Sequence, residues 1–270
     1  MTAAAVLIGL CGLVSAGAAQ APASEDRAWA TLRTALTSEH DEQRRSAARV
    51  LGLLEGDETA RGLALEALKD KDADVRAAAA DALGQMHAKG VAPELIALVK
   101  KESEVVVVMA GARALISLGD PTGYAVYYAV LTGERKAGGG LLESQKKMLK
   151  DPKKMAEFGF EQGIGFIPFA GVGYGAIKAI GRDDASPVRA AAAKILAKDR
   201  DPKTRDALLT ASGDKSWIVR AAALDALSRR GDPQVLEQIA PRLNDEEDVV
   251  KYTAAAATIH LSDVATKKVR

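Results

Sequence analysis

The stretch Asp74-Val75-Arg76-Ala77-Ala78-Ala79-Ala80-Asp81-Ala82-Leu83-Gly84 decides the fold of this chain of 270 residues, because it recurs along the sequence. Three copies end 32 residues apart (83 − 51 and 115 − 83), at Leu51, Leu83 and Leu115. Later copies begin 31 residues apart (219 − 188 and 250 − 219), at Val188, Val219 and Val250. A repeat of this length indicates a stacked array of small units rather than one closed globule.

Each repeat is predicted to contain two helices. The quoted stretch is rich in alanine and has no Gly or Pro in its interior, which favours a first helix, helix A, over 74–86. A break at 88–90 precedes an amphipathic helix B over 92–100, with Pro93 in the first turn, where no amide donor is missed. Short links that contain Asp, such as 69–72, supply cap acceptors for the next helix. The sequence therefore predicts an all-α solenoid of about six helix pairs.

The pattern Asp-x-x-x-x-Val-Arg-x-x-Ala-x-x-Ala-Leu-Gly resembles HEAT-like repeats of the short bacterial type that is also found in bilin lyases. The resemblance covers about 41–131 and 185–261. It implies that Arg and Asp of successive units form a hydrogen-bonded ladder inside the stack, with the arginines Arg44, Arg76, Arg189 and Arg220. It also predicts an interruption at Val108, which replaces the arginine of the third copy. The repeat is a scaffold that hosts several kinds of function, so it indicates fold more strongly than function.

Residues 1–21 are predicted to be a signal peptide. The first 24 residues contain no charge, and their apolar run ends in small residues that fit cleavage after Ala18. No Lys or Arg precedes the run, so the n-region is atypical, and an uncleaved anchor is the alternative. Leu10 beside Cys11 fits a lipoprotein processing site poorly. Cleavage would remove the single cysteine, and with it any disulfide or thiol nucleophile. We expect a periplasmic or secreted protein.

An insert rich in Gly and Phe is predicted over 132–184, between N-terminal repeats at 22–131 and C-terminal repeats at 185–270. All four Phe and eleven of the 24 Gly of the chain lie in it. A basic run at 146–154 precedes sixteen residues without charge, 162–177. A helix of that length would span only about 24 Å, and Pro168 lies inside it, so no transmembrane helix is expected. The insert is separable if the third and fourth units stack directly.

Three interpretations of residues 162–177 remain open. They can pack on the solenoid, because glycines permit close backbone contact with an alanine-rich helix. They can form a partner-binding lobe, with Phe166, Phe169 and Tyr174 as exposed anchors. They can also lie on a membrane surface, with the basic run at 146–154 facing anionic headgroups.

The motifs of common catalytic and metal sites do not occur in the sequence. His40, His87 and His260 are far apart, and none is followed by Glu, as the iron-binding His-Glu pairs of hydroxylases built on HEAT repeats would require. The sequence has no H-E-x-x-H, G-x-S-x-G or P-loop motif. The carboxylates at 244–248 lack calcium-loop spacing and are predicted to cap a helix. We predict no catalytic residue, cofactor or metal; an enzyme or enzyme subunit of the bilin-lyase type is an alternative.

The charge balance disfavours nucleic acid as a partner, because Lys and Arg number 37 and Asp and Glu 36. We therefore predict a non-catalytic protein–protein interaction scaffold or adaptor, with a membrane-surface protein as the alternative. The resemblance implies that helix B lines the concave side. Tyr124, Tyr127 and Tyr128 of the third helix B are accordingly the predicted partner surface, together with the anchors of the insert, although burial of at least one tyrosine is the simpler expectation.

Overall fold

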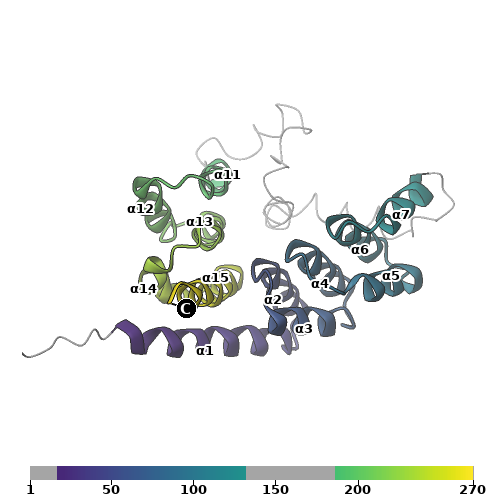
Figure 1. The fold of residues 1–270 in the computed structure, drawn as a ribbon, viewed down its shortest axis with the longest axis horizontal. Helices are drawn as coiled ribbons and strands as arrows, with labels where there is room; N and C mark the ends of the chain where they lie inside the picture. Colours follow the sequence, from purple (N-terminus) through teal and green to yellow (C-terminus); the bar gives the residue numbers. More distant parts are fainter. Residues whose placement is uncertain (1–16, 132–185, 270) are drawn as a thin grey trace, which may run out of the picture.

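The computed structural model describes residues 17–131 and 186–269, and this part of the chain is built from helices (Figure 1). The α-helices and 3₁₀ turns are α1 (Gly17–Leu36), α2 (Asp41–Val50), η1 (Leu51–Leu53), α3 (Glu58–Ala67), α4 (Ala73–Gln85), α5 (Ala92–Lys101), α6 (Val105–Ser117), α7 (Thr122–Leu131), α11 (Ser186–Leu196), α12 (Pro202–Ala211), α13 (Trp217–Arg230), η2 (Pro233–Val235), α14 (Leu236–Ile239), η3 (Ala240–Asn244) and α15 (Asp248–Val269). The predicted all-α solenoid is confirmed.

The second repeat shows how the sequence forms a helix pair. Helix α4 begins and ends within one residue of the predicted helix A. The Asp72 side chain caps it by accepting hydrogen bonds from the backbone amides of Asp74 and Val75, at 2.9 and 3.1 Å. Gly90 lies in the break with φ of 75°, a conformation that glycine adopts without strain. Helix α5 then begins at Ala92 with Pro93 in its first turn, as predicted.

The helices form two layers that follow a U-shaped path (Figure 1). The inner layer contains every helix A, in the spatial order α11, α13, α15, α2, α4 and α6, and each of these packs against the next. The outer layer contains α12, α14, α1, α3, α5 and α7. The concave side of the array is therefore lined by helix A, and the expectation that helix B lines it does not hold.

The order of the units in space differs from their order in the sequence. Helix α15 of the last repeat packs against α13 on one side and against α2 of the first repeat on the other. Helix α1 packs against both α15 and α2, and so provides the outer-layer helix at this junction. The third and fourth units lie at opposite ends of the array, not side by side (Figure 1). The insert was expected to be separable if the third and fourth units stack directly, and this condition is therefore not met.

Small residues allow the inner helices to approach closely. Four successive alanines of α15, Ala254–Ala257, are fully buried, because α13, α2 and α1 surround this central helix. At the contact between α4 and α6, a Cβ atom on Gly84 would lie 2.7 Å from the Cα of Ala114, which is closer than real Cβ contacts allow. Side chains this small set the axial spacing near the lower end of the usual range.

Helix α1 is held by an apolar stripe. Ala28, Leu32 and Ala35 are buried in the common core, and Arg27 donates a hydrogen bond to the side-chain oxygen of Asn244, at the end of η3. The helix begins at Gly17, inside the range predicted as a signal peptide, and Ala28, Leu32 and Ala35 all follow Ala18. Cleavage after Ala18 would therefore leave this packing in place.

We expect Leu32→Ala to lower the free energy of unfolding of the whole array by about 2–5 kcal/mol, because it opens a cavity between α1 and the two halves. Thr34→Ala, an exposed change on the same helix, is the control and should have little effect. Chemical denaturation followed by circular dichroism measures both. A loss confined to one half of the array, or no loss, would contradict the packing of α1 at the junction.

Candidate functional site

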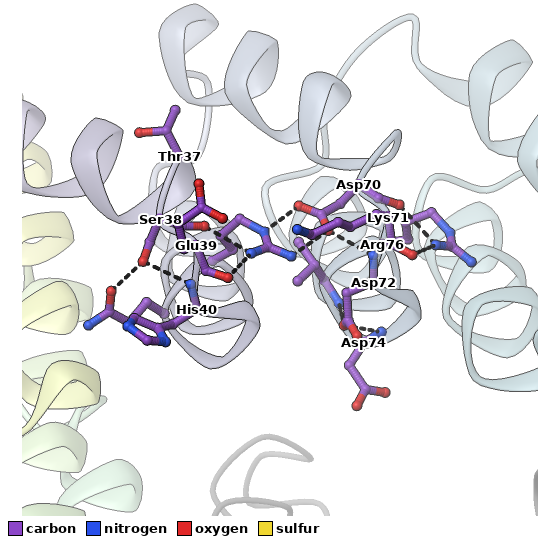
Figure 2. Close-up of polar contacts among 12 residues, drawn as sticks. Thr37, Ser38, Glu39, His40, Asp70, Lys71, Asp72, Asp74 and Arg76 are labelled. Carbon is purple, nitrogen blue, oxygen red and sulfur yellow. Dashed lines mark hydrogen bonds and ion pairs between the residues drawn. The ribbon is translucent and has the colours of Figure 1, made fainter.

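Arginines and carboxylates link successive units along one edge of the array. Arg44 binds Asp70 through two hydrogen bonds, Nε to Oδ2 at 2.7 Å and Nη2 to Oδ1 at 3.0 Å, and Arg220 binds Asp245 in the same way at 2.9 and 2.8 Å. Each arginine also donates to two backbone carbonyls of the link before its own helix; for Arg44 these belong to Ser38 and Glu39 (Figure 2). The remaining pairs are Arg76 with Glu102 at 2.8 Å, and Arg189 with Asp214. The predicted ladder is confirmed.

The carboxylates of this ladder are fully engaged. Asp70 also accepts a hydrogen bond from the Asp72 amide at 2.8 Å, and Asp245 accepts one from the Glu247 amide at 3.1 Å. Burial alone would raise the pKa of the Asp70 carboxyl, but the hydrogen bonds from Arg44 and the Asp72 amide lower it below 3.8. Burial would likewise raise the pKa of Glu102, but hydrogen bonds from Arg76 and from the Glu104 and Ser103 amides hold it below its ordinary value. The ladder groups bind one another within the array, which makes them structural.

The ladder is broken at two places. Val108 is buried where the third unit would carry its arginine, as predicted, and this unit ends the array. At the junction of α15 and α2, Lys251 stands at the arginine position and bonds Asp248 at 2.7 Å. Ser38 stands there at the position that Asp70 and Asp245 hold in other units. It accepts a hydrogen bond from the His40 amide at 3.1 Å (Figure 2). The two halves are instead joined by Gln43, which donates to Asp248 at 2.9 Å.

Arg220→Ala should lower the free energy of unfolding by about 3–5 kcal/mol, because the buried Asp245 would lose both guanidinium hydrogen bonds and keep, as a charged partner, only Arg242 at 4.0 Å. The side chains of Arg220 and Asp245 are 8% and 4% exposed. The control is Lys69→Ala, which removes an ion pair with Glu66 whose side chains are 72% and 74% exposed. That change should cost less than about 1 kcal/mol. Equal losses in thermal or urea denaturation would show that the ladder does not stabilise the stack.

A second row of residues crosses the inner helices five positions after the ladder arginine. In spatial order from α11 to α6 it reads Lys194, Asp225, Ala256, Arg49, Asp81 and Arg113. On α4, the residues with at most 1% exposure are Val75, Ala79, Ala80, Ala82 and Leu83, which lie on one side of the helix. Asp81 lies more than 90° around the helix from the centre of that side. The row therefore runs along the concave side, opposite the outer layer.

The charges of this row interact with one another. Arg113 of α6 donates two hydrogen bonds to Asp81 of α4, at 3.1 and 2.8 Å, and both side chains stay partly exposed. Asp225 accepts a hydrogen bond from Arg229 at 2.8 Å. Burial lowers the pKa of Lys194, while attraction by Asp225 opposes the shift. Lys194, Arg49, Asp81 and Arg113 are partly exposed, whereas Asp225 and Ala256 are buried. This row was not predicted from the sequence, although the aligned repeats carry its signal at one fixed position.

The predicted tyrosine surface is only partly brought together. Tyr124 is exposed on α7, whereas Tyr127 is half-buried and packs against the core. Tyr128 lies on α7 with a side chain outside the described set. Helix α7, which carries these tyrosines, lies in the outer layer at one end of the array (Figure 1). Phe166, Phe169 and Tyr174, with the basic run at 146–154, lie outside the described residues.

The described residues show few features that would support a catalytic, metal-binding or membrane-spanning role. His87 Nδ1 lies 3.6 Å from Glu55 Oε1, and burial lowers the pKa of His260 on α15. Within 17–131 and 186–269, no cluster of three or more His, Cys, Asp or Glu side chains has the arrangement of a metal site. In the same part of the chain, no helix has the length and apolar character needed to cross a bilayer. In the acidic stretch 244–248, Asp245 binds Arg220 and accepts a hydrogen bond from the Glu247 amide, just before α15 begins. This is a structural role next to a helix start, as predicted.

Comparison with known proteins places this geometry in context. A family model described as HEAT repeats matches residues 29–116 and 175–258, which together exceed half of the chain. Among solved structures, the complex of CpcE and CpcF of phycocyanin lyase from Nostoc sp. PCC7120 is 22% identical with a TM-score of 0.35, and the match covers 84% of this chain and 85% of that one.

Two further structures are similar at the same level. Human deoxyhypusine hydroxylase in complex with glycerol is 16% identical with a TM-score of 0.34, covering 92% of this chain and 100% of that one. An engineered protein is 18% identical with a TM-score of 0.27, covering 88% and 98%. No curated protein sequence matches the chain at a significant level.

Proposed function

Because this chain belongs to the HEAT-repeat family, we propose that it is an exported, non-catalytic scaffold that binds another protein along the concave side of its array. The observation that supports this most directly is the set of partly exposed charges in the row that crosses the array, which are Lys194, Arg49, Asp81 and Arg113 on four of the inner helices. Repeat arrays of this kind use their extended concave surfaces for binding.

The chemistry of the concave side indicates the kind of partner. Acidic and basic groups alternate in the row, with one uncharged position, Ala256, on the central helix. A protein surface that offers the complementary order of charges would be steered and aligned by it. Nucleic acid is a poor fit, because every phosphate carries the same sign and meets acidic groups in this row. The ladder carboxylates and arginines are satisfied within the array, so they are not part of the binding surface.

Two other roles predicted from the sequence remain weaker alternatives. A lyase-type enzyme is supported by the resemblance of the repeats but by no cluster of acid, base and nucleophile among the described residues. Membrane association rests on residues 146–154 and 162–177, which lie outside the described part of the chain. The non-catalytic role is proposed because the sequence carries no catalytic motif.

The partner surface can be tested by photo-crosslinking in extract of the producing cells. A benzophenone amino acid at Gln85, an exposed residue at the C-terminal end of α4 beside the Asp81 row, should capture a defined protein. The same probe at Glu66, an exposed residue of the outer layer, is the control and should not capture it. Capture of one protein with equal yield from both positions would contradict binding along the concave side.

The exchanged pair Asp81→Arg with Arg113→Asp then tests the charge order. It keeps an ion pair between α4 and α6 but reverses the sign at both positions, so thermal stability should stay close to that of the natural chain. Partner affinity, measured by titration at low salt, should fall by about tenfold or more, which corresponds to about 1.4 kcal/mol. Unchanged affinity would exclude these charges from the interface.

Export is a separate part of the proposal. Mass spectrometry of protein recovered from the periplasm or medium should show an N-terminus close to Ala19, because the charge-free start ends in small residues that fit cleavage after Ala18. The Thr34→Ala variant, altered well beyond this position, should give the same N-terminus. An intact Met1 on soluble protein in the cytosol would contradict the signal peptide.

A further inference from the structure

Among the residues that the structure describes, one inner helix lacks the apolar cover that its counterparts have. On α11, Val188 and Ile195 are 70% and 62% exposed, and Ala192 between them is exposed as well. The equivalent residues of α13, which lie 31 positions later, are Val219, Ala223 and Ala226, and they are between 0% and 2% exposed. The three positions form one stripe of the helix, since they are spaced at i, i+4 and i+7. The same stripe is therefore core on α13 and surface on α11.

Elsewhere this face lies toward the unit that precedes each inner helix in the array. A Cβ atom added to Gly52, which follows α2, would lie 3.3 Å from the Cα of Ala82, the α4 equivalent of Ile195. Helix α2 packs on α4, α4 on α6, α11 on α13, and α13 on α15. Helix α11 begins the described array, so a cover from the same chain would have to come from residues before Ser186. Terminal units of repeat arrays need their outer face to be capped or polar for solubility. Within the described part of the chain, the stripe on α11 is neither capped nor polar.

We propose that residues 162–177 of the same chain fill this place, covering the stripe of Val188, Ala192 and Ile195 and capping one end of the array. The segment contains no charged residue and supplies Ile164, Phe166, Ile167 and Phe169, which match an apolar stripe. Its glycines permit the close backbone approach that an alanine-rich helix favours.

Chain length permits this arrangement. Residues 178–185 form the link, and eight residues reach about 26–29 Å when extended. Helix α11 has 11 residues and is about 16 Å long, so every part of the stripe is within reach. A tethered segment also has a high effective concentration, of millimolar order, which a second copy or a separate protein must match by affinity.

The proposal assigns Phe166 and Phe169 to the interior of the array end rather than to an exposed anchor. It can be tested with the full-length protein by placing a benzophenone amino acid at Ile195. Irradiation should give crosslinks to residues 162–177, identified by peptide mass spectrometry. The matched control is the same probe at Tyr124, an exposed aromatic position at the opposite end of the array, which should give no crosslink to this segment.

Mixing ¹⁴N- and ¹⁵N-labelled copies before irradiation separates the outcomes. We expect each crosslinked peptide pair to carry a single isotope. We also expect chymotrypsin to cleave after Phe166 and Phe169 at least fivefold faster in Ile195→Glu than in Tyr124→Glu. Circular dichroism shows whether Ile195→Glu and Tyr124→Glu keep their helices. If they do not, crosslinking from a benzophenone amino acid at Val188 serves as the second test of the stripe. Mixed-isotope crosslinks would assign the stripe to a second copy, and crosslinks to another protein or to none of residues 162–177 would equally overturn the proposal.

Discussion

Every inner helix of this array needs an apolar partner in the outer layer, and that requirement organises the molecule. The inner helices are alanine-rich and are buried on several sides, because each packs against inner neighbours as well as an outer element, as α13 does against α11, α15 and α12. At the middle of the array the requirement is met by α1, which covers both α15 and α2 through Ala28, Leu32 and Ala35. The position of one N-terminal helix therefore determines which units become neighbours.

Polar interactions follow this arrangement but do not create it. Within each half, a guanidinium bridges two units and also holds the link before its own helix, so that spacing and register are fixed together. Between the halves the corresponding residues are Lys251 and Ser38, and a single amide-to-carboxylate bond from Gln43 to Asp248 takes their place. The junction consequently relies on packing by α1 more than on charge.

The sequence was sufficient to predict the local structure because repeat units are locally encoded. The helix pair of the second unit, the ladder arginines and the break at Val108 all follow from residues within one period. The order of the units could not be predicted, since the repeat pattern is nearly the same on α13 and α15 and does not specify which other unit packs beside each helix. The charge row was missed for a related reason: Asp81 and Arg113 are typical solvated residues until stacking aligns them. The resemblance implied that the helix carrying Tyr124 would line the concave side, whereas the packing of this chain places α7 in the outer layer.

The contact between α1 and α15 joins the first helix that the structure describes to the last one, across more than two hundred residues of intervening chain. A linear solenoid can grow unit by unit from one end, because each unit touches only its neighbours. Here the central contact is the most distant in sequence, so loop closure must precede completion of the array, and such non-local contacts slow folding. Each half can gain its helices early, but the two halves become one body only after the 22 residues of α15 have been synthesised.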